Sequence, residues 1–319
     1  QRTAPKPLWN RRRVDRFTEL NSVPRVTLSF MEASNSNPTP VRKPNWLRVK
    51  LPTGTNYRAV RNVVDQYKLH TICESGRCPN MGECWGEGTA TFMILGNICT
   101  RSCGFCNVAT GRPLPVDWDE PDRVARSIQR MKIKHAVLTS VDRDDLADGG
   151  SIIWAETVAA VRRLSPGTTM ETLIPDFRGI TDQIDRIVEA APEVVSHNME
   201  TVRRLTRQVR IQAQYDRSLE VLRYLKANGV NRTKTGIMLG LGETEDELYQ
   251  TLDEVRSVGV DVVTLGQYLQ PSARHLPVQR FVEPEEFERL GAYARTLGFR
   301  HVESSPLVRS SYHAERHVH

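Results

Sequence analysis

All six cysteines of the 319-residue chain lie in one window that begins at position 73 and ends at position 106. Their spacing divides them into two triplets, Cys73-x4-Cys78-x5-Cys84 and Cys99-x3-Cys103-x2-Cys106. Structural zinc sites usually close with four ligands and favour paired C-x2-C arms, and neither triplet supplies such a set by itself. Thiolates in threes suit iron-sulfur clusters, in which a cubane iron without a cysteine is left open to another ligand. The spacing therefore predicts two cluster sites, each with an iron where chemistry can occur.

The second triplet, Cys99-Thr-Arg-Ser-Cys103-Gly-Phe-Cys106, resembles the CxxxCxxC signature of the radical S-adenosylmethionine (SAM) enzymes, including the aromatic Phe105 before the last cysteine. In that family three thiolates hold a [4Fe-4S] cluster, and the methionyl group of SAM occupies the fourth iron. The resemblance implies the same cofactors here. Ferredoxin-like electron carriers instead show runs of four cysteines with tighter spacing.

The first triplet narrows the resemblance to one family. Together with its flanking residues, CESGRCPNMGECW, it resembles the auxiliary-cluster motif of lipoyl synthases, and Arg309-Ser310-Ser311-Tyr312 resembles the RSSY motif of the same family. In lipoyl synthases the second serine of that motif ligates the auxiliary cluster, a role that carries over to Ser311. The resemblance runs from about Lys43 to His313. It implies two [4Fe-4S] clusters, with the ligand sets Cys73, Cys78, Cys84 and Ser311, and Cys99, Cys103 and Cys106.

The resemblance also implies a reaction and its partners. Lipoyl synthases insert two sulfur atoms at carbons 6 and 8 of an octanoyl group attached to a lipoyl carrier protein, either a lipoyl domain or the H protein of the glycine-cleavage system. Electrons come from a donor such as flavodoxin or ferredoxin. Two alternatives remain. A biotin synthase-like sulfur-inserting enzyme would keep CxxxCxxC but lack the first triplet and RSSY, and a non-enzymatic electron carrier would need neither a barrel nor SAM motifs.

The composition fits a soluble cytoplasmic enzyme that binds neither membrane nor nucleic acid. Hydrophobic residues make up 39% of the chain, enough for a core, and no apolar run approaches the roughly 18 residues that span a bilayer. No segment has the apolar h-region of a signal peptide, so we expect a reducing compartment and free thiols in place of a disulfide framework. The net charge is +6, but the first 30 residues hold seven basic residues against two acidic ones. The nearly neutral remainder argues against a nucleic-acid-binding body.

The first 40 residues differ from the rest of the chain. They lack sustained periodicity, and Ser34–Pro40 has a composition prone to turns and disorder. An Arg-rich, acid-poor segment also fits a mitochondrial transit peptide. We favour an over-extended reading frame, because no clear amphipathic helix is present and the family resemblance begins only after Met31. The predicted division is a disordered or spurious extension at 1–40, an auxiliary-motif extension at 41–90, a barrel at 91–304 and a tail with RSSY at 305–319.

Alternating helices and strands follow the cysteine window. A helix with Val60, Val63 and Val64 on one side is expected around Tyr57–Tyr67. Buried strands are expected at Thr91–Leu95, Ala136–Val141, Thr169–Ile174, Val194–His197, Lys234–Leu239 and Val260–Leu265. Helices are expected at Asp119–Met131, Ile153–Leu164 and Asp182–Ala191, then from an Asp216 cap to Gly229, from a capping box at Thr244–Glu247, and from Pro284 to Gly298.

These elements make about six β/α units, two short of a closed eight-unit barrel. The predicted fold class is therefore α/β, an open partial TIM-type barrel with N-terminal and C-terminal extensions, as radical SAM enzymes have. Functional residues should lie at the C-terminal ends of its strands. The candidates for SAM contacts in these places are Gly149, Gly150, Glu171, His197, Asn198, Glu200, Gly236 and Gly240.

These candidates differ in what supports them. The Gly149-Gly150 pair either starts a helix or, as in the family, exposes backbone to the amino group of SAM. Gly236 and Gly240 resemble the family's adenine-contacting GxIxGxxE motif, whose glycines permit close approach of a ring. Glu171 stands in an apolar strand, where an unpaired carboxylate is costly to bury. Either a core hydrogen bond or a cofactor contact must satisfy it, and the sequence leaves both open.

Overall fold

The computed structural model of the chain describes residues 43–48, 55–66, 69–75, 78, 80–86 and 90–318. The chain divides into two compact units, Gln1–Arg42 and Lys43–His319, and every described residue belongs to the second. The extension predicted for residues 1–40 therefore lies outside the described residues.

One mostly parallel sheet organises the described chain. Its strands, in sequence order, are β1 (His70–Thr71), β2 (Thr91–Ile94), β5 (His135–Ser140), β6 (Thr169–Leu173), β7 (Val194–Ser196), β8 (Arg232–Leu239), β9 (Val262–Gln267) and β10 (His301–Ser304). Neighbours in the sheet follow the same order, and all pairs are parallel except β1 with β2. Because β1 and β10 form its two edges, this sheet is open.

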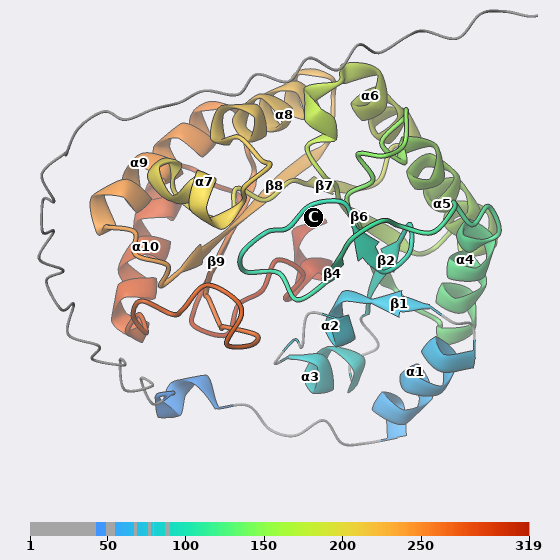
Figure 1. Cartoon of the computed structure of the whole chain (residues 1–319), viewed down its shortest axis with the longest axis horizontal. Helices are drawn as coiled ribbons and strands as arrows, with labels where there is room; N and C mark the ends of the chain where they lie inside the picture. Colours follow the sequence, from blue (N-terminus) through green and yellow to red (C-terminus); the bar gives the residue numbers. More distant parts are fainter. Residues whose placement is uncertain are drawn as a thin grey trace, which may run out of the picture. The chain divides into compact units, whose positions relative to one another are not determined.

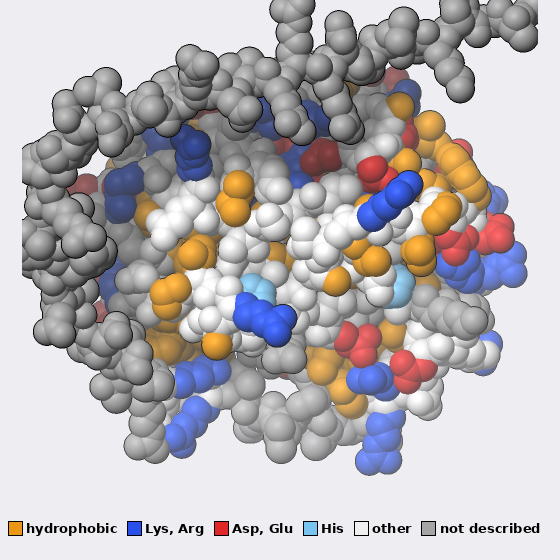
Figure 2. Space-filling model, in the orientation of Figure 1, with side chains coloured by type: hydrophobic (Ala, Val, Ile, Leu, Met, Phe, Trp, Pro, Cys, Tyr) orange, Lys and Arg blue, Asp and Glu red, His pale blue; other side chains and the backbone are white. Residues whose placement is uncertain are grey.

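Helices connect the parallel strands and lie on the outer side of the curved sheet (Figure 1). They are α4 (Glu120–Met131), α5 (Ser151–Leu164), α6 (Thr181–Ala190), α8 (Tyr215–Ala227), α9 (Glu245–Ser257) and α10 (Pro284–Thr296). Each occupies a segment for which the sequence predicted a helix. With β2 and the strands from β5 to β9 they complete six β/α units, which confirms the predicted open partial barrel. Many of the charged side chains visible in Figure 2 lie toward the edge, over these outer helices.

Further elements precede β2, lie between the strands or follow β10. Before β2 they are η1 (Asn45–Leu47), α1 (Thr55–Gln66), α2 (Ile72–Ser75) and α3 (Met81–Gly86). The predicted helix around Tyr57 is therefore present as α1, with Val60 and Val64 buried. After β2 they are the paired strands β3 (Ile98–Cys99) and β4 (Ala109–Thr110), then η2 (Phe177–Gly179), η3 (Arg203–Leu205), α7 (Thr206–Val209) and η4 (Ala314–His317).

Two strands of the sheet were not predicted. β10 pairs in parallel with β9 and adds a seventh parallel strand after the six units. Its residues, His-Val-Glu-Ser, are all only partly buried and contain a single apolar side chain, so no apolar run marks it. β1 has two residues and pairs antiparallel with β2. Both are edge strands, whose sequences are set less by burial than those of central strands.

Helix starts were predicted with mixed success. The capping box of α9 is confirmed: Thr244 Oγ1 accepts from Glu247 N at 3.3 Å, and Thr244 N donates to Glu247 Oε2 at 2.9 Å. The Asp216 cap is wrong, because α8 begins one residue earlier and its N-cap, Gln214, forms no side-chain cap. Asp216 instead lies in the first turn, where the helix dipole favours a carboxylate, and pairs with Arg203 at 2.6 Å.

A fully buried ion pair joins β6 to β8. Lys234 Nζ donates to Glu171 Oε2 at 2.8 Å, and both side chains are completely inaccessible to solvent. Ser196 of β7, between the two strands, donates its hydroxyl to Glu171 Oε1 at 2.6 Å. Burial alone would raise the pKa of Glu171, but the charge of Lys234 holds that pKa below its ordinary value. Of the two alternatives left open by the sequence, the structure therefore has the core contact.

Removing one partner of this pair should destabilise the barrel. We expect Lys234→Met to lower the free energy of unfolding by about 3–5 kcal/mol, because it leaves the Glu171 carboxylate buried and uncompensated. The double variant Lys234→Met, Glu171→Leu should recover most of that loss, since no buried charge remains. Urea unfolding followed by circular dichroism measures both. A single variant as stable as the unmodified chain would contradict the ion pair.

Candidate active site

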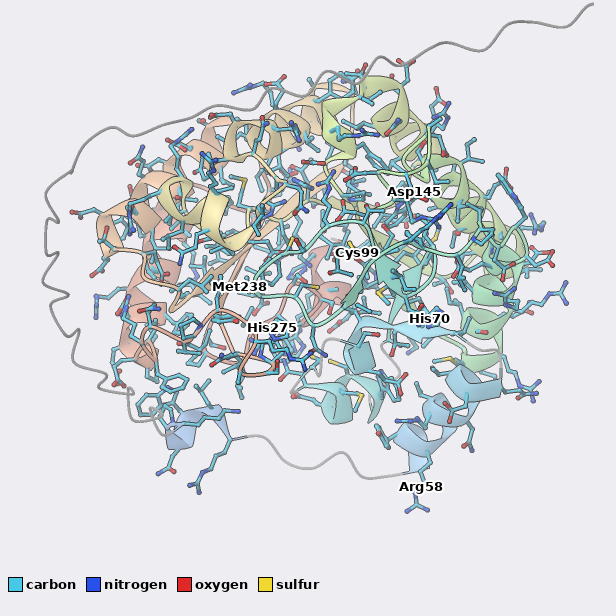
Figure 3. All side chains as sticks on the ribbon, in the orientation of Figure 1. Arg58, His70, Cys99, Asp145, Met238 and His275 are labelled. Atoms are coloured by element: carbon cyan, nitrogen blue, oxygen red, sulfur yellow. The ribbon has the colours of Figure 1, made fainter. Side chains whose placement is uncertain are left out.

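A cavity of about 660 Å³ lies inside the curve of the sheet at the C-terminal ends of the strands. Residues at or just beyond the ends of β5 to β9 line it, together with the cysteine window and residues 308–311 near the C-terminus. Figure 3 shows Cys99, Met238 and His275 toward the middle of the molecule, inside the ring of helices. This is the end of the barrel at which functional residues were expected.

The second cysteine triplet lies on the loop between β2 and α4, and all three cysteines line the cavity. Cys99 Sγ accepts the backbone N–H groups of Asp142 at 3.3 Å and Arg101 at 3.4 Å. Burial raises the pKa of Cys99 to about 11 and that of Cys103 to about 12, so without a metal ion these thiols are protonated. A bound metal reverses this, because a coordinating thiol gives up its proton.

Arg101, inside the CxxxCxxC motif, fixes this loop to two strand ends. Its guanidinium donates to Asp144 at 2.6 and 2.9 Å and to Asp176 at 2.8 Å, beyond β5 and β6 respectively. Although burial favours the neutral acid, Arg101 holds the pKa of Asp176 well below its usual range. Arg101 was not predicted as a functional residue, although its place between Cys99 and Cys103 was a signal for it.

A second contact holds the same loop from the opposite side. In the segment after β9, His275 Nε2 lies 3.0 Å from the carbonyl oxygen of Cys106, and Leu276 N donates to Gly104 O at 2.9 Å. Ser272 Oγ lies 2.9 Å from His275 Nδ1 and orients the ring. The cluster loop is therefore held from the ends of β5, β6 and β9, which pre-organises its three thiols.

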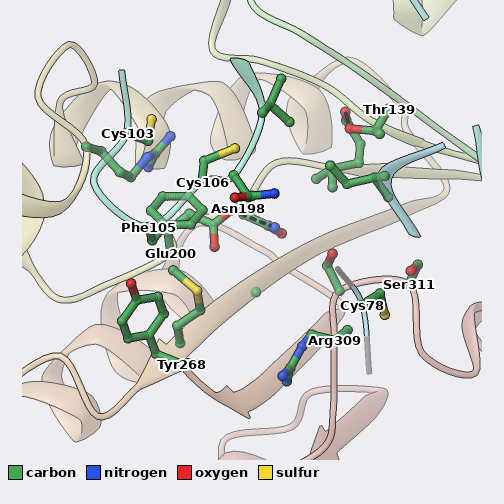
Figure 4. A pocket seen from close by; sticks show the side chains of 18 of the residues that line it. Cys78, Cys103, Phe105, Cys106, Thr139, Asn198, Glu200, Tyr268, Arg309 and Ser311 are labelled. Atoms are coloured by element: carbon green, nitrogen blue, oxygen red, sulfur yellow. Dashed lines mark hydrogen bonds between the residues drawn. The ribbon is translucent and has the colours of Figure 1, made fainter. Parts of the chain in front are cut away.

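The first triplet reaches the other end of the cavity. Cys73, on α2, and Cys78 line it with Ser311, whereas Cys84, on α3, is not among the lining residues. Figure 4 shows Cys78 and Ser311 together, apart from Cys103 and Cys106. Burial raises the pKa of Cys73 to about 11 and also raises that of Cys78.

No three of the described His, Cys, Asp and Glu side chains converge closely enough to bind one metal ion. A cubane cluster does not need such convergence, because each thiolate binds a different iron atom. The fit of the residues to a cluster therefore rests on their chemistry and placement: three thiols at one end of the cavity, and two thiols with a serine hydroxyl at the other.

Two contacts link the C-terminal tail to the segment that carries the first triplet. Asn80 Nδ2 donates to Leu307 O at 2.7 Å across 227 residues of sequence, and Tyr312 Oη donates to Glu83 Oε1 at 3.4 Å. Neither Asn80 nor Glu83 was identified from the sequence. Their positions between the cysteines of the first triplet are the only signal, and that signal does not reveal the partner.

His197 lies at the end of β7 and lines the cavity, but its ring nitrogens are engaged within the protein. Nδ1 donates to Ile174 O at 3.0 Å, so Nε2 accepts from Ser218 Oγ at 2.9 Å. Burial and the nearby charge of Arg210 lower the pKa of His197 to about 4. A neutral imidazole therefore braces the end of β7 at ordinary pH.

Asn198 and Glu200 offer polar atoms to the cavity. Asn198 Nδ2 donates to Glu200 Oε1 at 3.0 Å, and Asn198 Oδ1 is buried without a hydrogen-bond partner among the described residues. Burial raises the pKa of Glu200. A Cβ on Gly236 would lie 2.9 Å from Thr264 Oγ1 and 3.0 Å from Asn198 Oδ1, so glycine lets these two side chains lie close to the strand. Asn198 and Gly236 both line the cavity, and an unsatisfied acceptor there suits a ligand that carries N–H donors.

The structure places four of the predicted SAM contacts outside the cavity lining: Gly149, Gly150, Glu171 and Gly240. Gly150 caps α5 with φ +85°, and a Cβ there would lie 2.5 Å from Leu95 Cδ1. Gly149, with φ +60°, faces Gln183 in the same way. Gly240 packs against the side chain of Gln267, with no space for a Cβ. These glycines meet protein at their Cα positions, and Glu171 is satisfied by the core ion pair.

Comparison with known proteins agrees with this geometry. A family model described as "Radical SAM superfamily" matches residues 93–255, and one described as "N-terminal domain of lipoyl synthase of Radical_SAM family" matches residues 30–78. The mitochondrial lipoyl synthase of Nematostella vectensis is 72% identical over 277 residues, which cover 87% of this chain and 95% of that protein. The chain belongs to the lipoyl synthase family. The lipoyl synthase of Flavobacterium johnsoniae is also 72% identical, over 279 residues that cover 88% and 97% of the two chains.

Solved structures support the fold at much lower identity. Streptococcus suis SuiB bound to precursor peptide SuiA matches with a TM-score of 0.54 at 10% identity, covering 77% of this chain and 52% of that chain. The FeFe-hydrogenase maturase HydG from Carboxydothermus hydrogenoformans matches with a TM-score of 0.52 at 12% identity, covering 82% and 77%. These likenesses concern the fold alone.

Membership in the lipoyl synthase family gives the class of chemistry. The chain is a sulfur-inserting radical SAM enzyme, and the family implies an iron-sulfur cluster, SAM and a lipoyl carrier protein as substrate. The predicted function is thereby confirmed at the level of the reaction.

Among the described residues, no helix is both long and apolar enough to cross a bilayer.

Proposed function

We propose that the chain inserts sulfur at carbons 6 and 8 of a carrier-bound octanoyl group with two [4Fe-4S] clusters in the one cavity. Cys99, Cys103 and Cys106 would hold the cluster that binds SAM. The auxiliary cluster that supplies sulfur would be held by Cys73, Cys78, Cys84 and Ser311. When bound, the cluster at Cys99, Cys103 and Cys106 and SAM would supply a radical that removes hydrogen from the octanoyl chain, and the auxiliary cluster would supply the sulfur that replaces it.

The observation that carries this proposal is the shared cavity. Cys99, Cys103 and Cys106 line one end of it and Cys73, Cys78 and Ser311 the other, with the interior of the barrel between them. Phe105, Met238 and Tyr268 are among the apolar and aromatic residues that line it, which suits an alkyl chain. The protein then positions a carbon between a radical source and a sulfur donor, and excludes water from both.

For SAM we propose contacts with Asn198, Glu200 and Gly236 at the end that holds the second triplet. Asn198 Oδ1 supplies the unsatisfied acceptor, and Gly236 lines the cavity beside it, where a Cβ would lie only 3.0 Å from that oxygen. His197 would act indirectly, by bracing the end of β7. For Gly149, Gly150, Gly240 and Glu171 we propose packing roles in place of direct contact.

We also propose the remaining partners and the compartment. A small reductant such as flavodoxin or ferredoxin would deliver electrons, the carrier would be a lipoyl domain or the glycine-cleavage H protein, and the cytoplasm would keep the thiols reduced. Anaerobic reconstitution, iron and sulfide analysis and Mössbauer spectroscopy test the cluster count, and an octanoylated carrier tests the product. About eight irons per chain and a lipoyl product support the proposal. About four irons would contradict it.

Residues 1–30 should be dispensable for this reaction. They lie outside the described residues, and the lipoyl synthase N-terminal match begins only at residue 30. We expect a chain that starts at Met31 to form lipoyl product at the full rate. The measurement is product formation from an octanoylated carrier at several salt concentrations. An about tenfold loss at low salt that shrinks as the salt concentration rises would instead show that the basic segment steers an acidic carrier.

A further inference from the structure

The Lys234–Glu171 pair lies directly beneath the floor of the cavity. Side chains alternate along a strand, so residues two apart share a face. On β8, Gly236 and Met238 line the cavity, and Lys234 is the next residue down on the same face. On β6, Leu173 lines the cavity and Glu171 is the next residue down. The ion pair therefore occupies the interior of the barrel, one layer below the site.

A third group from the C-terminus completes this layer. Lys234 Nζ lies 3.2 Å from His317 Nδ1, in addition to its contact with Glu171. An ammonium group only donates hydrogen bonds, so His317 Nδ1 is the acceptor and the imidazole is neutral, with its proton on Nε2. Burial, opposed by Glu303 and reinforced by the charge of Lys234, lowers the pKa of His317 in agreement with this assignment.

His317 brings the end of the chain into the barrel. It is the last residue of η4, and both it and Ala314 at the start of that turn are completely buried. Figure 1 shows the C-terminus inside the curve of the sheet, surrounded by strands. A partial barrel has fewer strands than a closed one to fill its interior, and here the tail supplies the missing side chains.

Ser311 lies between this buried turn and a second fixed point on β9. Gln267 N donates to Pro306 O at 3.2 Å, and Gly266 approaches Val308 O so closely that no Cβ would fit. The tail is thus held five residues before Ser311 and again six residues after it. The contact of Tyr312 with Glu83 near Ser311 is long, at 3.4 Å, and Glu83 is exposed, so this contact restrains the turn only weakly.

We propose that His317 is a positioning residue for sulfur insertion: its hydrogen bond from Lys234 anchors the C-terminal tail inside the barrel and so holds Ser311 at the auxiliary cysteines. This rests on the proposed role of Ser311 as a cluster ligand. The Lys234–Glu171 pair has two roles in this arrangement. Its two charges satisfy each other within the core, and the Lys234 ammonium has a further N–H group that it donates to His317 on the tail.

The test uses the variants His317→Ala, His317→Gln and, as a matched control, Arg316→Ala. Arg316 is the neighbouring residue but is exposed, and it lies outside the anchor. His317→Ala keeps the Lys234–Glu171 pair, so the barrel should stay folded, which its thermal unfolding midpoint checks. Glutamine can accept the Lys234 hydrogen bond through its amide oxygen and should restore the anchor.

Hydrogen exchange gives a readout that does not depend on activity. In the reconstituted full chain, backbone amides in residues 308–316 should exchange at least about tenfold faster in His317→Ala, because a hydrogen bond to a charged donor is lost. Exchange in Arg316→Ala and His317→Gln should stay within about twofold of the unmodified chain. Unchanged exchange in His317→Ala would overturn the proposed anchor.

Activity then separates positioning from general damage. His317→Ala should form 5′-deoxyadenosine from SAM at the control rate but lose at least about tenfold in lipoyl product, and His317→Gln should regain most of it. Equal loss of both activities, or normal product despite faster exchange, would overturn the positioning role. If Ser311→Ala makes normal product, the ligand role of Ser311 fails, while the exchange data still report on the anchor.

Discussion

A chain in which Cys99, Cys103 and Cys106 are all replaced by Ala should retain one cluster and form no 5′-deoxyadenosine from SAM. The three thiols line one end of the cavity in the segment between β2 and α4, and Cys73 and Cys78 of the first triplet line the other end, in the segment before β2. Replacing Cys99, Cys103 and Cys106 therefore leaves the ligands of the auxiliary cluster in place. Iron analysis should show about four irons in place of about eight, and chromatography should show no cleavage product.

The matched control is the triple variant Cys73→Ala, Cys78→Ala, Cys84→Ala. It should also bind about four irons but should still cleave SAM, because the loop held by Arg101 and His275 is untouched. It should make no lipoyl product, since the sulfur donor is absent. Cleavage of SAM by the first variant, or its absence in the second, would show that the two triplets have been assigned the wrong way round.

The fold was largely predictable because its central strands are buried on both faces. Each of β2 and β5 reads as an apolar run, and helices with one apolar face lie between such runs. The exceptions are local. β10 is partly buried and mostly polar, so its sequence carries no strand signal, and only its pairing with β9 creates it. Asp216 is a good cap by type, yet its helix starts one residue earlier.

The site was predictable where covalent spacing encodes the chemistry, as in the two cysteine triplets. It was not predictable where a side chain depends on a distant partner. Glu171 is satisfied by Lys234, 63 residues away, and Lys234 in turn contacts His317 after a further 83 residues. A sequence pattern cannot show such pairs, because they exist only after the strands are side by side. The role of Gly240 could not be predicted for the same reason, because this glycine makes room for the side chain of Gln267 on the neighbouring strand.

Ser311→Ala should retain the cluster at Cys99 and cleave SAM at the normal rate, but should form little or no lipoyl product from an octanoylated carrier. Ser311 lines the cavity with Cys73 and Cys78, although it lies more than two hundred residues after them. Three cysteines leave one iron of a cubane without a protein ligand, and a serine hydroxyl at this place can supply it. Removal of a residue that hydrogen-bonds to a metal ligand already lowers activity by about 10–100-fold. Loss of the ligand itself should therefore lower product formation by at least about a hundredfold.

Ser310→Ala is the matched control, because Ser310 precedes Ser311 and lines the same cavity. Replacing it removes a hydroxyl of the same type without removing the proposed ligand, so product formation should stay within about threefold of the unmodified chain. Mössbauer spectra should change for one of the two clusters in Ser311→Ala and for neither in Ser310→Ala. Equal damage at both serines, or normal product from Ser311→Ala, would remove Ser311 from the ligand set, and the auxiliary cluster would then need another fourth donor.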